Sequence, residues 1–390
     1  MLSQAKPLTI LMFCPSAYGG IGEHAFYQAT ALQKSGTKVI CLVAPAFLDG
    51  RETEFEKVVC LINPISASGQ GIVRKMKLAW RIIANYWMLA WQIIKRRPDL
   101  VLLDSYVEYL SPFWVWPHWM LARVFGVKYA ANLHDPVRHY AIGPEWWHRL
   151  SVRLAYLPLD FVIVHDELAE STVVPRSIRV VKAPHGLYEI SESVTDVAAI
   201  RRKWGVRDGQ KVFLAFGFLR DGKNLDLAIQ ALKSVPEAFL VIAGSVASSK
   251  DKGFSFYRHL AANLRVEERC RFFEGFVEDG DLAKYFGGAD FVLLTYASSF
   301  HSQSGVLNLA ARARKPVLAS AAPSPLIDSV KKFNLGVTVE PDSAEAMAQG
   351  MCHLASAYPQ AHWDDYAAAA SWSVNARRVC EAAGLSVNGP

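Results

Sequence analysis

Cysteine is scarce in this sequence and forms no recognisable motif. Six cysteines are spread over 390 residues, and no pair has the CxxC spacing of a zinc or redox site. They are Cys14, Cys41, Cys60, Cys270, Cys352 and Cys380. Scattered cysteines of this kind, several of them in apolar strand-like runs, are typical of reduced core residues in a cytoplasmic protein. We therefore expect a cytoplasmic location.

Long apolar runs and the signature motifs of several enzyme classes are also missing. No segment offers about twenty uninterrupted apolar residues, so we expect no membrane-spanning helix. The first apolar run is too short for a signal sequence and indicates a first strand. HExxH, GxSxG, the Walker spacing and any Cys/His cluster suited to a metal are absent from the sequence. We therefore expect no bound metal and no NTPase-type phosphate site.

The composition favours a well-packed globular enzyme. Apolar residues make up 52% of the chain and charged residues 20%. The net charge of +6 is moderate, and neither zinc-finger spacing nor an aromatic-glycine RNA-binding signature occurs, so we expect no nucleic-acid partner. A chain of 390 residues exceeds what one core usually supports, which predicts two domains.

Short apolar runs alternate with helical patterns along the whole chain. The expected strands of a first series are 8–14, 38–43, 58–62, 99–103, 128–132, 161–164 and 180–182. Those of a second series are 212–216, 239–243, 271–273, 291–295, 316–319 and 336–339. Two successive series predict an α/β protein with two Rossmann-like, doubly wound domains facing an interdomain cleft. We expect an N-terminal domain over 1–186, a C-terminal domain over 187–360, and a C-terminal helix in 361–390 that packs back on the first domain.

The segment 71–97 is expected to form a long, basic, Trp-rich helix. It lies in a stretch, 57–98, that has no acidic residue. One helical face carries Met76, Trp80, Ile83, Trp87, Trp91 and Ile94, and the opposite stripe carries Arg74, Lys77, Arg81, Asn85, Gln92 and Lys95. Such a helix suits a peripheral position on an anionic membrane, at the inner face of the plasma membrane. A core helix with a solvated basic stripe is an equally good interpretation. The Trp-rich segment near 112–120 carries the same two alternatives.

Two loops have the features of a phosphate site. In 295–320 an apolar strand leads through small polar residues to Ser304, Gly305 and Val306 at a helix start, where backbone N–H groups converge. After the strand 212–216, Arg220 and Lys223 precede another helix, and two cations suit a diphosphate. The plainer alternatives are a ligand-free βα turn and two solvated cations.

The first domain offers two further candidate segments. The first strand is followed by a turn containing Gly19 and Gly20, and a helix is expected from Glu23. No acidic residue ends the second strand, which argues against a dinucleotide cofactor. The strand 128–132 delivers His134 and Asp135 to the carboxyl end of the sheet, where α/β folds bind ligands. An Asp that caps the following loop is the alternative.

Taken together, these segments resemble the family-4 retaining glycosyltransferases of the GT-B fold, over nearly the whole chain. The resemblance rests on residues 18–24, 133–135, 184–186, 216–232, 275–277 with 282–293, 336–342 and 371–372. It implies a nucleotide-sugar donor on the C-terminal domain, an acceptor on the N-terminal one, and transfer with retention and without a metal.

The resemblance also implies roles for individual residues. Arg220 and Lys223, with the amides of Ser304, Gly305 and Val306, would hold the donor diphosphate. His134 would lie near the sugar as a catalytic residue, and Gly19 and Gly20 would let donor and acceptor approach the backbone. Gly275, Phe276 and Val277 would line the side of the nucleotide base.

One departure from the family pattern concerns the acidic residues. The family usually carries a Glu-x7-Glu pair where this chain has His301 and Leu309, or Phe300 and Asn308 after a slip of one residue, and no acidic residue occurs in 291–327. His301, Gln303 and Asn308 are then the candidates for sugar contacts. The sequence favours a hexosyltransferase-type enzyme that acts on a lipid-linked or membrane-proximal saccharide in surface-polysaccharide synthesis. The alternative is a non-catalytic GT-B scaffold in a transferase complex.

Overall fold

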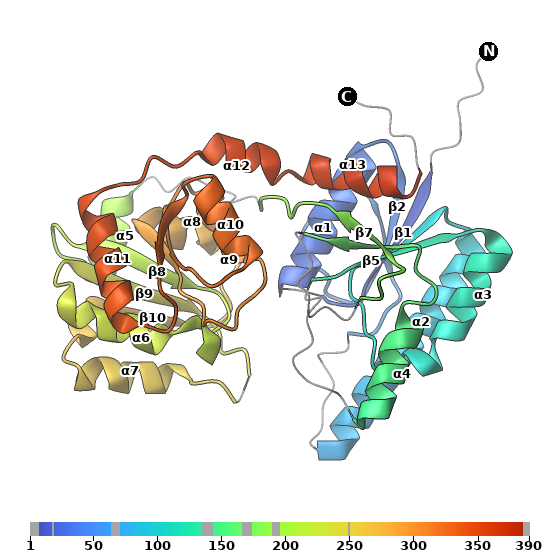
Figure 1. Ribbon diagram of the computed structural model, residues 1–390, viewed down its shortest axis with the longest axis horizontal. Helices are drawn as coiled ribbons and strands as arrows, with labels where there is room; N and C mark the ends of the chain where they lie inside the picture. Colours follow the sequence, from blue (N-terminus) through green and yellow to red (C-terminus); the bar gives the residue numbers. More distant parts are fainter. Residues whose placement is uncertain are drawn as a thin grey trace, which may run out of the picture. The chain divides into compact units, whose positions relative to one another are not determined.

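The computed structural model describes residues 8–17, 19–63, 71–134, 143–165, 174–188, 196–248 and 250–384. Tyr18 and Asp135, which belong to two of the motifs above, lie outside the described residues. The chain divides into two compact units, Met1–Gly186 with Ser371–Pro390, and Leu187–Ala370. Each unit holds one parallel sheet with helices packed against it (Figure 1). The prediction of two Rossmann-like α/β domains is confirmed.

The sheet of the first unit has seven strands in the order β3-β2-β1-β4-β5-β6-β7. They are β1 (Thr9–Cys14), β2 (Lys38–Val43), β3 (Glu56–Val59), β4 (Leu100–Leu103), β5 (Lys128–Asn132), β6 (Phe161–Val164) and β7 (Arg179–Lys182). All neighbouring pairs run parallel, so the carboxyl ends of the strands meet at one edge. The continuous apolar character of β1 follows from burial on both faces, because helices cover each side.

Each face of this first sheet has its own core. The helices are α1 (Gly19–Lys34), α2 (Gly71–Arg96), η1 (Ser111–Phe113), α3 (Val115–Phe125), α4 (Glu145–Ala155) and α13 (Trp372–Ala382). Leu11 and Phe13 of β1 pack in the core that α2, α3 and α4 cover. Ile10 and Met12 point the other way, into the core shared with α1 and α13. Residues from the end of the chain therefore complete the first unit.

The second unit has six parallel strands in the order β10-β9-β8-β11-β12-β13. They are β8 (Lys211–Phe216), β9 (Ala238–Gly244), β10 (Cys270–Glu274), β11 (Phe291–Leu294), β12 (Val317–Ser320) and β13 (Gly336–Val339). The helices are α5 (Val197–Trp204), η2 (Asp221–Lys223), α6 (Leu225–Ala231), η3 (Leu232–Ser234), α7 (Phe254–Asn263), η4 (Glu267–Arg269), α8 (Asp279–Gly288), α9 (Gly305–Arg312), α10 (Pro325–Lys332), α11 (Ala344–Ser356) and α12 (Trp363–Ala369).

Two segments differ from the expected organisation. The polar pattern of 187–208 predicts an interdomain segment, but this stretch contains α5, which Asp196 caps by accepting a hydrogen bond from the Ala199 N–H. Trp204 at its end is buried against α8, so this part of the interpretation is wrong. At the other end of the unit, α12 packs on α9, whereas we had placed all of 361–390 with the first domain.

The helix α1 begins four residues earlier than predicted. Gly19 and Gly20 are its first two residues and not part of a separate turn. Gly19 has φ +80°, a backbone conformation that residues with a side chain rarely adopt, and no atom lies within 4 Å of where a Cβ would stand. Among the described residues, no side chain therefore covers the two glycines at the start of α1.

The long helix α2 buries two residues of the stripe that we expected to be solvated, while Arg74, Lys77 and Lys95 of this stripe are exposed. Asn85, assigned to the basic stripe, is buried and holds both the N–H and the carbonyl of Ile62 through its amide, at 2.8 Å and 2.7 Å. Gln92 of the same stripe is also buried. The tryptophans stand outside instead: Trp80, Trp87 and Trp91 are 62%, 53% and 60% exposed. The core interpretation of these tryptophans is therefore wrong.

Exposed apolar side chains continue from α2 onto its neighbours. α3 packs against α2, and Figure 1 draws α2, α3 and α4 at the same end of the first unit. The Trp-rich surface is defined here as Met76, Trp80, Trp87, Trp91, Trp116, Met120 and Trp146, all more than half exposed. Trp114, from the same segment as Trp116, is buried and stacks on Tyr86. One Trp-rich segment thus supplies both core and surface.

Candidate functional site

Lys223 lies at the carboxyl end of β8, in the second unit. It ends η2, and its Nζ donates a hydrogen bond to the Phe216 carbonyl at 2.6 Å. Burial, together with the neighbouring Arg220 charge, lowers the pKa of the Lys223 ammonium to about 8. A partly buried cation held at the end of a central parallel strand is placed where an anion would be bound strongly.

Gly217 brings the two predicted phosphate loops together. It has φ +89°, and a Cβ at this position would lie 3.5 Å from Lys223 Nζ and 3.8 Å from Val306 Cγ2. The missing side chain leaves the space between the lysine and the start of α9 open. Lys223 and Val306, which we assigned to one diphosphate site from separate motifs, are therefore close neighbours.

The start of α9 presents the backbone groups that we expected. Gly305 is the first helical residue, and Ser304 precedes it with an extended backbone. The Ser304 side chain does not cap the helix, because its hydroxyl is hydrogen bonded to the Tyr296 hydroxyl at 2.8 Å. The N–H groups of a first helical turn have no intrahelical acceptor, so those of Gly305 and Val306 point out of the helix end. Arg220 is exposed and its charge lowers the pKa of Tyr296, although burial outweighs this effect and the pKa is raised.

The three residues considered for sugar contacts lie in different environments. His301 is exposed, with Nδ1 3.0 Å from the Pro323 carbonyl. Gln303 donates to the Pro325 carbonyl at 3.2 Å. Asn308 is buried, and its Oδ1 accepts a hydrogen bond from the Tyr366 hydroxyl at 2.7 Å. Asn308 therefore helps to fix α12 on α9.

The residues assigned to the nucleotide base follow the edge strand β10. Gly275 has φ +136° and donates a hydrogen bond to the Gly244 carbonyl at the end of β9, at 2.8 Å. Phe276 is exposed, whereas Val277 packs against the core of the unit. An exposed ring at the carboxyl edge of the sheet is a suitable surface for base stacking.

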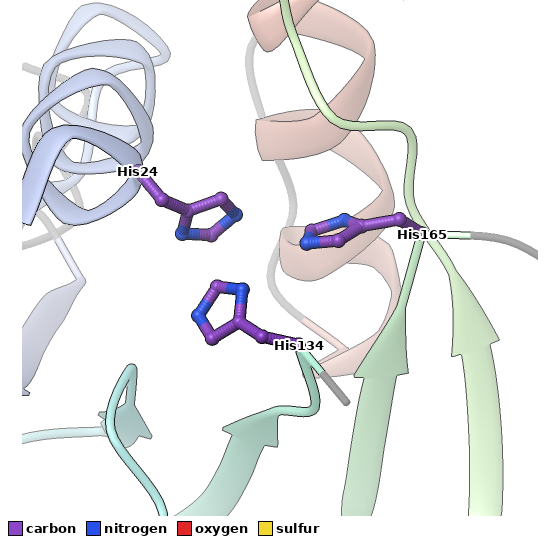
Figure 2. A group of neighbouring side chains, drawn as sticks. All are labelled: His24, His134 and His165. Carbon is purple, nitrogen blue, oxygen red and sulfur yellow. The ribbon is translucent and has the colours of Figure 1, made fainter. Parts of the chain in front are cut away.

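The first unit gathers histidines at the same kind of edge. His134, His165 and His185 follow β5, β6 and β7, and His24 faces them from α1. The His24 ring centroid lies 4.6 Å, 5.0 Å and 5.3 Å from those of His134, His165 and His185. Figure 2 shows His24, His134 and His165 with ring nitrogens turned toward one another. Trp372 of α13 lies next to these histidines, with its ring centroid 5.1 Å from that of His24.

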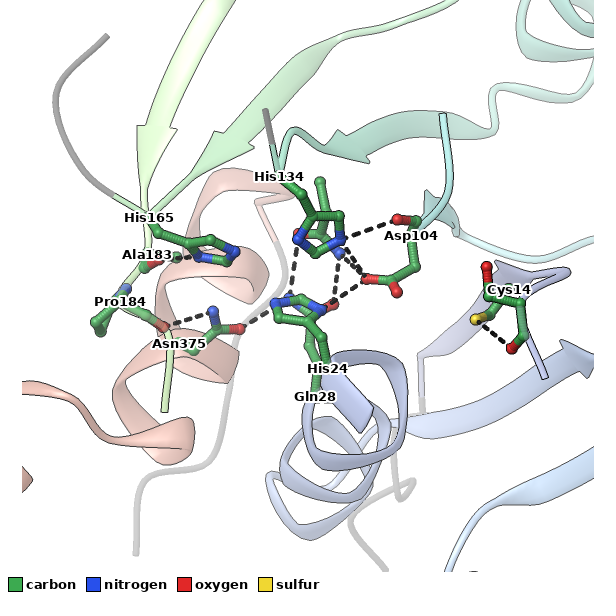
Figure 3. A network of polar contacts seen from close by, with 11 residues as sticks. Cys14, His24, Gln28, Asp104, His134, His165, Ala183, Pro184 and Asn375 are labelled. Carbon is green, nitrogen blue, oxygen red and sulfur yellow. Dashed lines mark hydrogen bonds and ion pairs between the residues drawn. The ribbon is translucent and has the colours of Figure 1, made fainter. Parts of the chain in front are cut away.

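Asp104 directly follows β4 and lies beside His24 and His134 (Figure 3). Its Oδ1 is 2.7 Å from His24 Nδ1 and accepts a hydrogen bond from Asn132 at 2.8 Å. Its backbone carbonyl lies 3.0 Å from His134 Nε2. Burial alone would raise the pKa of the Asp104 carboxyl, but His24 and His134 outweigh it and hold that pKa well below its usual range. The carboxylate is therefore ionised and fixes both imidazoles.

The imidazoles themselves differ in protonation. Burial lowers the pKa of His24 in spite of Asp104, and burial with the surrounding histidines lowers the pKa of His165 strongly. Burial likewise lowers the pKa of His185 to about 3. At His134 burial also acts to lower the pKa, but the hydrogen bond and charge of Asp104 raise it overall. The predicted catalytic residue is the most basic member of this cluster.

Sequence reasoning named His134 but did not assign a role to its partners. Asp104 and His165 stand in no motif, and His24 and His185 entered only as parts of family segments. A usable signal was present, since Asp104, His134, His165 and His185 all follow parallel strands within a few residues. Such residues meet at one sheet edge.

Comparison with known proteins agrees with this architecture. Residues 196–369 match the family model described as glycosyl transferases group 1. An uncharacterized glycosyltransferase of Methanocaldococcus jannaschii is 28% identical over 172 residues, which are 43% of this chain and 42% of that protein. The match to this curated relative thus spans less than half of its length.

Two solved structures share the fold over nearly their whole length. A glycosyltransferase from Rickettsia africae has a TM-score of 0.73 at 16% identity, covering 97% of this chain and 98% of its own. Anabaena HepE in complex with UDP-glucose has a TM-score of 0.67 at 17% identity, covering 97% of this chain and 100% of its own. The fold is that of GT-B glycosyltransferases.

The length and the apolar character of a helix decide whether it can span a membrane. Among the described residues, no helix combines the length and the apolar character needed to cross a bilayer.

Proposed function

We propose that the chain is a retaining glycosyltransferase that takes a sugar from a nucleotide-sugar donor. The observation that carries this proposal is the meeting of Lys223 with the start of α9 across Gly217, within the segment that matches group 1 glycosyltransferases. A lysine ammonium and the N–H groups of a helix start suit the two phosphates of a nucleoside diphosphate. Stabilising the charge on this leaving group is the main catalytic demand of the reaction.

The proposed donor site lies in the second unit. Lys223 would neutralise the diphosphate, with Arg220 as an exposed second cation, while the Gly305 and Val306 amides would bind its oxygens. Gly275, Phe276 and Val277 would accommodate the base. HepE, a structural relative, was solved with UDP and with UDP-glucose, so uridine nucleotides are the first donors to try.

For the acceptor we propose a lipid-linked or membrane-proximal saccharide, as in surface-polysaccharide assembly. The support is the Trp-rich surface, in which five tryptophans and two methionines are more than half exposed. Arg74, Lys75 and Lys77 are exposed at the start of the same helix, and 57–98 has no acidic residue. Tryptophans beside basic residues favour a peripheral position on an anionic lipid surface.

Calorimetric titration with UDP, ADP and GDP, followed by their glucose conjugates, tests the donor proposal. We expect one of these nucleotides to bind, and Lys223→Ala to weaken its binding roughly tenfold to hundredfold, the usual loss for a charge-assisted hydrogen bond. Lys233→Ala removes an exposed lysine of η3 and serves as the matched control. If none of the nucleotides binds at millimolar concentration, or both variants bind alike, the proposal fails.

The missing acidic pair makes a non-catalytic scaffold the second candidate. Leu309 and Asn308 are the two alternatives for the second residue of this pair, and both are buried. Asn308 accepts a hydrogen bond from the Tyr366 hydroxyl. Nucleotide binding without sugar transfer to any acceptor of a lipid-linked panel would favour the scaffold. Transfer observed by NMR, with the anomeric configuration of the donor kept in the product, would favour the retaining enzyme.

A further inference from the structure

We propose that His24, His134 and His165 form a binding site for a transition-metal dication, with Zn²⁺ as the first candidate. Each histidine offers one nitrogen, and these atoms lie within 4.8 Å of one another (Figure 2). The site lies entirely in the first unit, whereas the residues proposed for the donor lie in the second. It adds to the proposed function and does not depend on it.

The hydrogen bonds decide which nitrogen of each ring is left over. His24 Nδ1 donates to the Asp104 carboxylate, and His165 Nδ1 lies 3.2 Å from the Ala183 carbonyl, which can only accept. Nε2 of both rings is therefore the lone-pair atom. Both Nε2 atoms are buried and, among the described residues, have no hydrogen-bond partner. Two buried, unsatisfied acceptors at one place require an explanation.

His134 supplies the third lone pair. Its Nε2 lies 3.0 Å from the Asp104 carbonyl and 3.6 Å from Asp104 Oδ1, both acceptors, so Nε2 carries a proton. In the neutral ring Nδ1 is then the ligand atom, and Figure 2 draws His134 with a nitrogen turned toward the other two rings. Three imidazoles whose second nitrogen is bound by a carboxylate or a carbonyl form the usual arrangement behind a metal site.

The chemistry of the group favours a cation over an anion. An anion requires donors, but the atoms that converge here are acceptors, and the ionised Asp104 lies directly behind two of the rings. The negative charge of Asp104 would partly balance a dication in this buried place. Imidazole ligands suit Zn²⁺ and its neighbours among the transition metals. Three protein nitrogens leave a fourth position for water or a substrate oxygen.

The rings must move slightly to bind a metal. Nitrogens at about 2.1 Å from a tetrahedral Zn²⁺ are about 3.4 Å apart, so separations of up to 4.8 Å must shorten by up to about 1.4 Å. His134 and His165 follow β5 and β6, and His24 lies in the second turn of α1. Binding would therefore join three elements of the first unit at one edge of its sheet.

Equilibrium dialysis of the full chain without a histidine tag, stripped of metal and loaded with Zn²⁺, provides the test. We expect one Zn²⁺ per chain, and a loss of affinity of at least a hundredfold in His165→Asn and in His24→Asn. His353→Asn, at an exposed position of α11, is the matched control and retains the wild-type affinity. Wild-type protein that binds no Zn²⁺, or variants that bind as the control does, would overturn the proposal.

A second measurement on the unaltered protein covers the case in which the variants fail to fold. With Co²⁺ in place of Zn²⁺, metal-bound histidines give strongly shifted N–H proton signals in NMR spectra. We expect signals from His24 Nδ1–H, His165 Nδ1–H and His134 Nε2–H, which disappear in D₂O. If protein loaded with Co²⁺ gives no shifted exchangeable signals, the metal site is contradicted. The buried nitrogens would then share a proton in place of a metal ion.

Discussion

His24 Nδ1 lies 2.7 Å from Oδ1 of Asp104, and both residues are almost completely buried. The same carboxyl group raises the pKa of His134, whose Nε2 lies 3.6 Å from the same oxygen. Asp104 thus orients one imidazole and sets the basicity of a second. A single carboxylate at the end of β4 controls the histidine cluster.

Asp104→Asn is expected to lower the pKa of His134. Burial acts to lower this pKa, and the remaining hydrogen bonds to residue 104 oppose it more weakly once the carboxylate charge is gone. The pH titration of the His134 ring protons in NMR spectra, on metal-free protein, measures this change. Glu145→Gln removes an exposed carboxylate of the same unit and should leave the His134 titration unchanged. An unaltered His134 pKa in Asp104→Asn would contradict the assignment.

Nucleotide affinity is expected to fall as pH rises above about 8. Lys223 has its pKa lowered to about 8, so the ammonium that would meet the diphosphate is present below that pH and is lost above it. Bound diphosphate raises this pKa, so the affinity falls from about pH 8 to the pKa of the complex and is constant again above it. Calorimetric titrations between pH 7 and 10 show the trend, and Lys223→Arg, which stays protonated, should abolish it. A wild-type affinity that is constant over this range argues against Lys223 as the phosphate ligand.

The Trp-rich surface is expected to bind anionic vesicles. In flotation assays the protein should rise with vesicles that contain phosphatidylglycerol, and less with neutral vesicles or at high salt. Replacing Trp80, Trp87 and Trp91 together by serine should abolish flotation, since each exposed ring contributes apolar contact with the lipid. Tyr358→Ser changes an exposed aromatic residue of the other unit and is the control. Equal recovery with neutral and anionic vesicles, or none with either, removes the support for a membrane-proximal acceptor.

Two glycines of α8 should respond to alanine in opposite directions. A Cβ on Gly288 would lie 2.4 Å from Trp204, whose ring is buried, so Gly288→Ala should destabilise the protein by about 1–3 kcal/mol. Gly280 has no atom within 4 Å of its Cβ position and is exposed. Gly280→Ala should therefore stabilise the helix by up to about 1 kcal/mol. Urea unfolding of both variants measures the difference, and similar midpoints would show that α5 does not pack as described.

The strands were predictable because parallel strands buried on both faces give continuous apolar runs. β2, β5, β6 and β13 have the expected bounds, and the other strands differ by one or two residues at their ends, apart from β3, which ends three residues early. The helix α5 was missed because its sequence is polar, although Asp196 and Gly205 mark its two ends. Only packing against α8 reveals its buried side.

The side of α2 that faces the core could not be read from the sequence. Periodicity separates the tryptophan face from the Asn85 face but does not tell which one is buried, and here the core accepts the amide because Ile62 supplies both hydrogen bonds. The histidine cluster could be predicted only in part, because the ends of the strands indicate His134, His165 and His185 but no pattern places His24 with them. Its members are spread between His24 and His185, and only the strand order places them together.

The backbone N–H of Leu187 donates a hydrogen bond to the carbonyl of Ala370 at 3.1 Å, so the second unit begins and ends at adjacent points. It is an insertion within the first unit, which regains its own chain only at Ser371. Asn375 then hydrogen bonds to Gln28 and to the Pro184 carbonyl. A fragment stopping at Gly186 would lack α13 and expose the apolar face of α1, whereas 187–370 is a continuous segment with neighbouring ends. Dissection of this protein should therefore excise the middle of the chain and rejoin the flanks, not cut it in two.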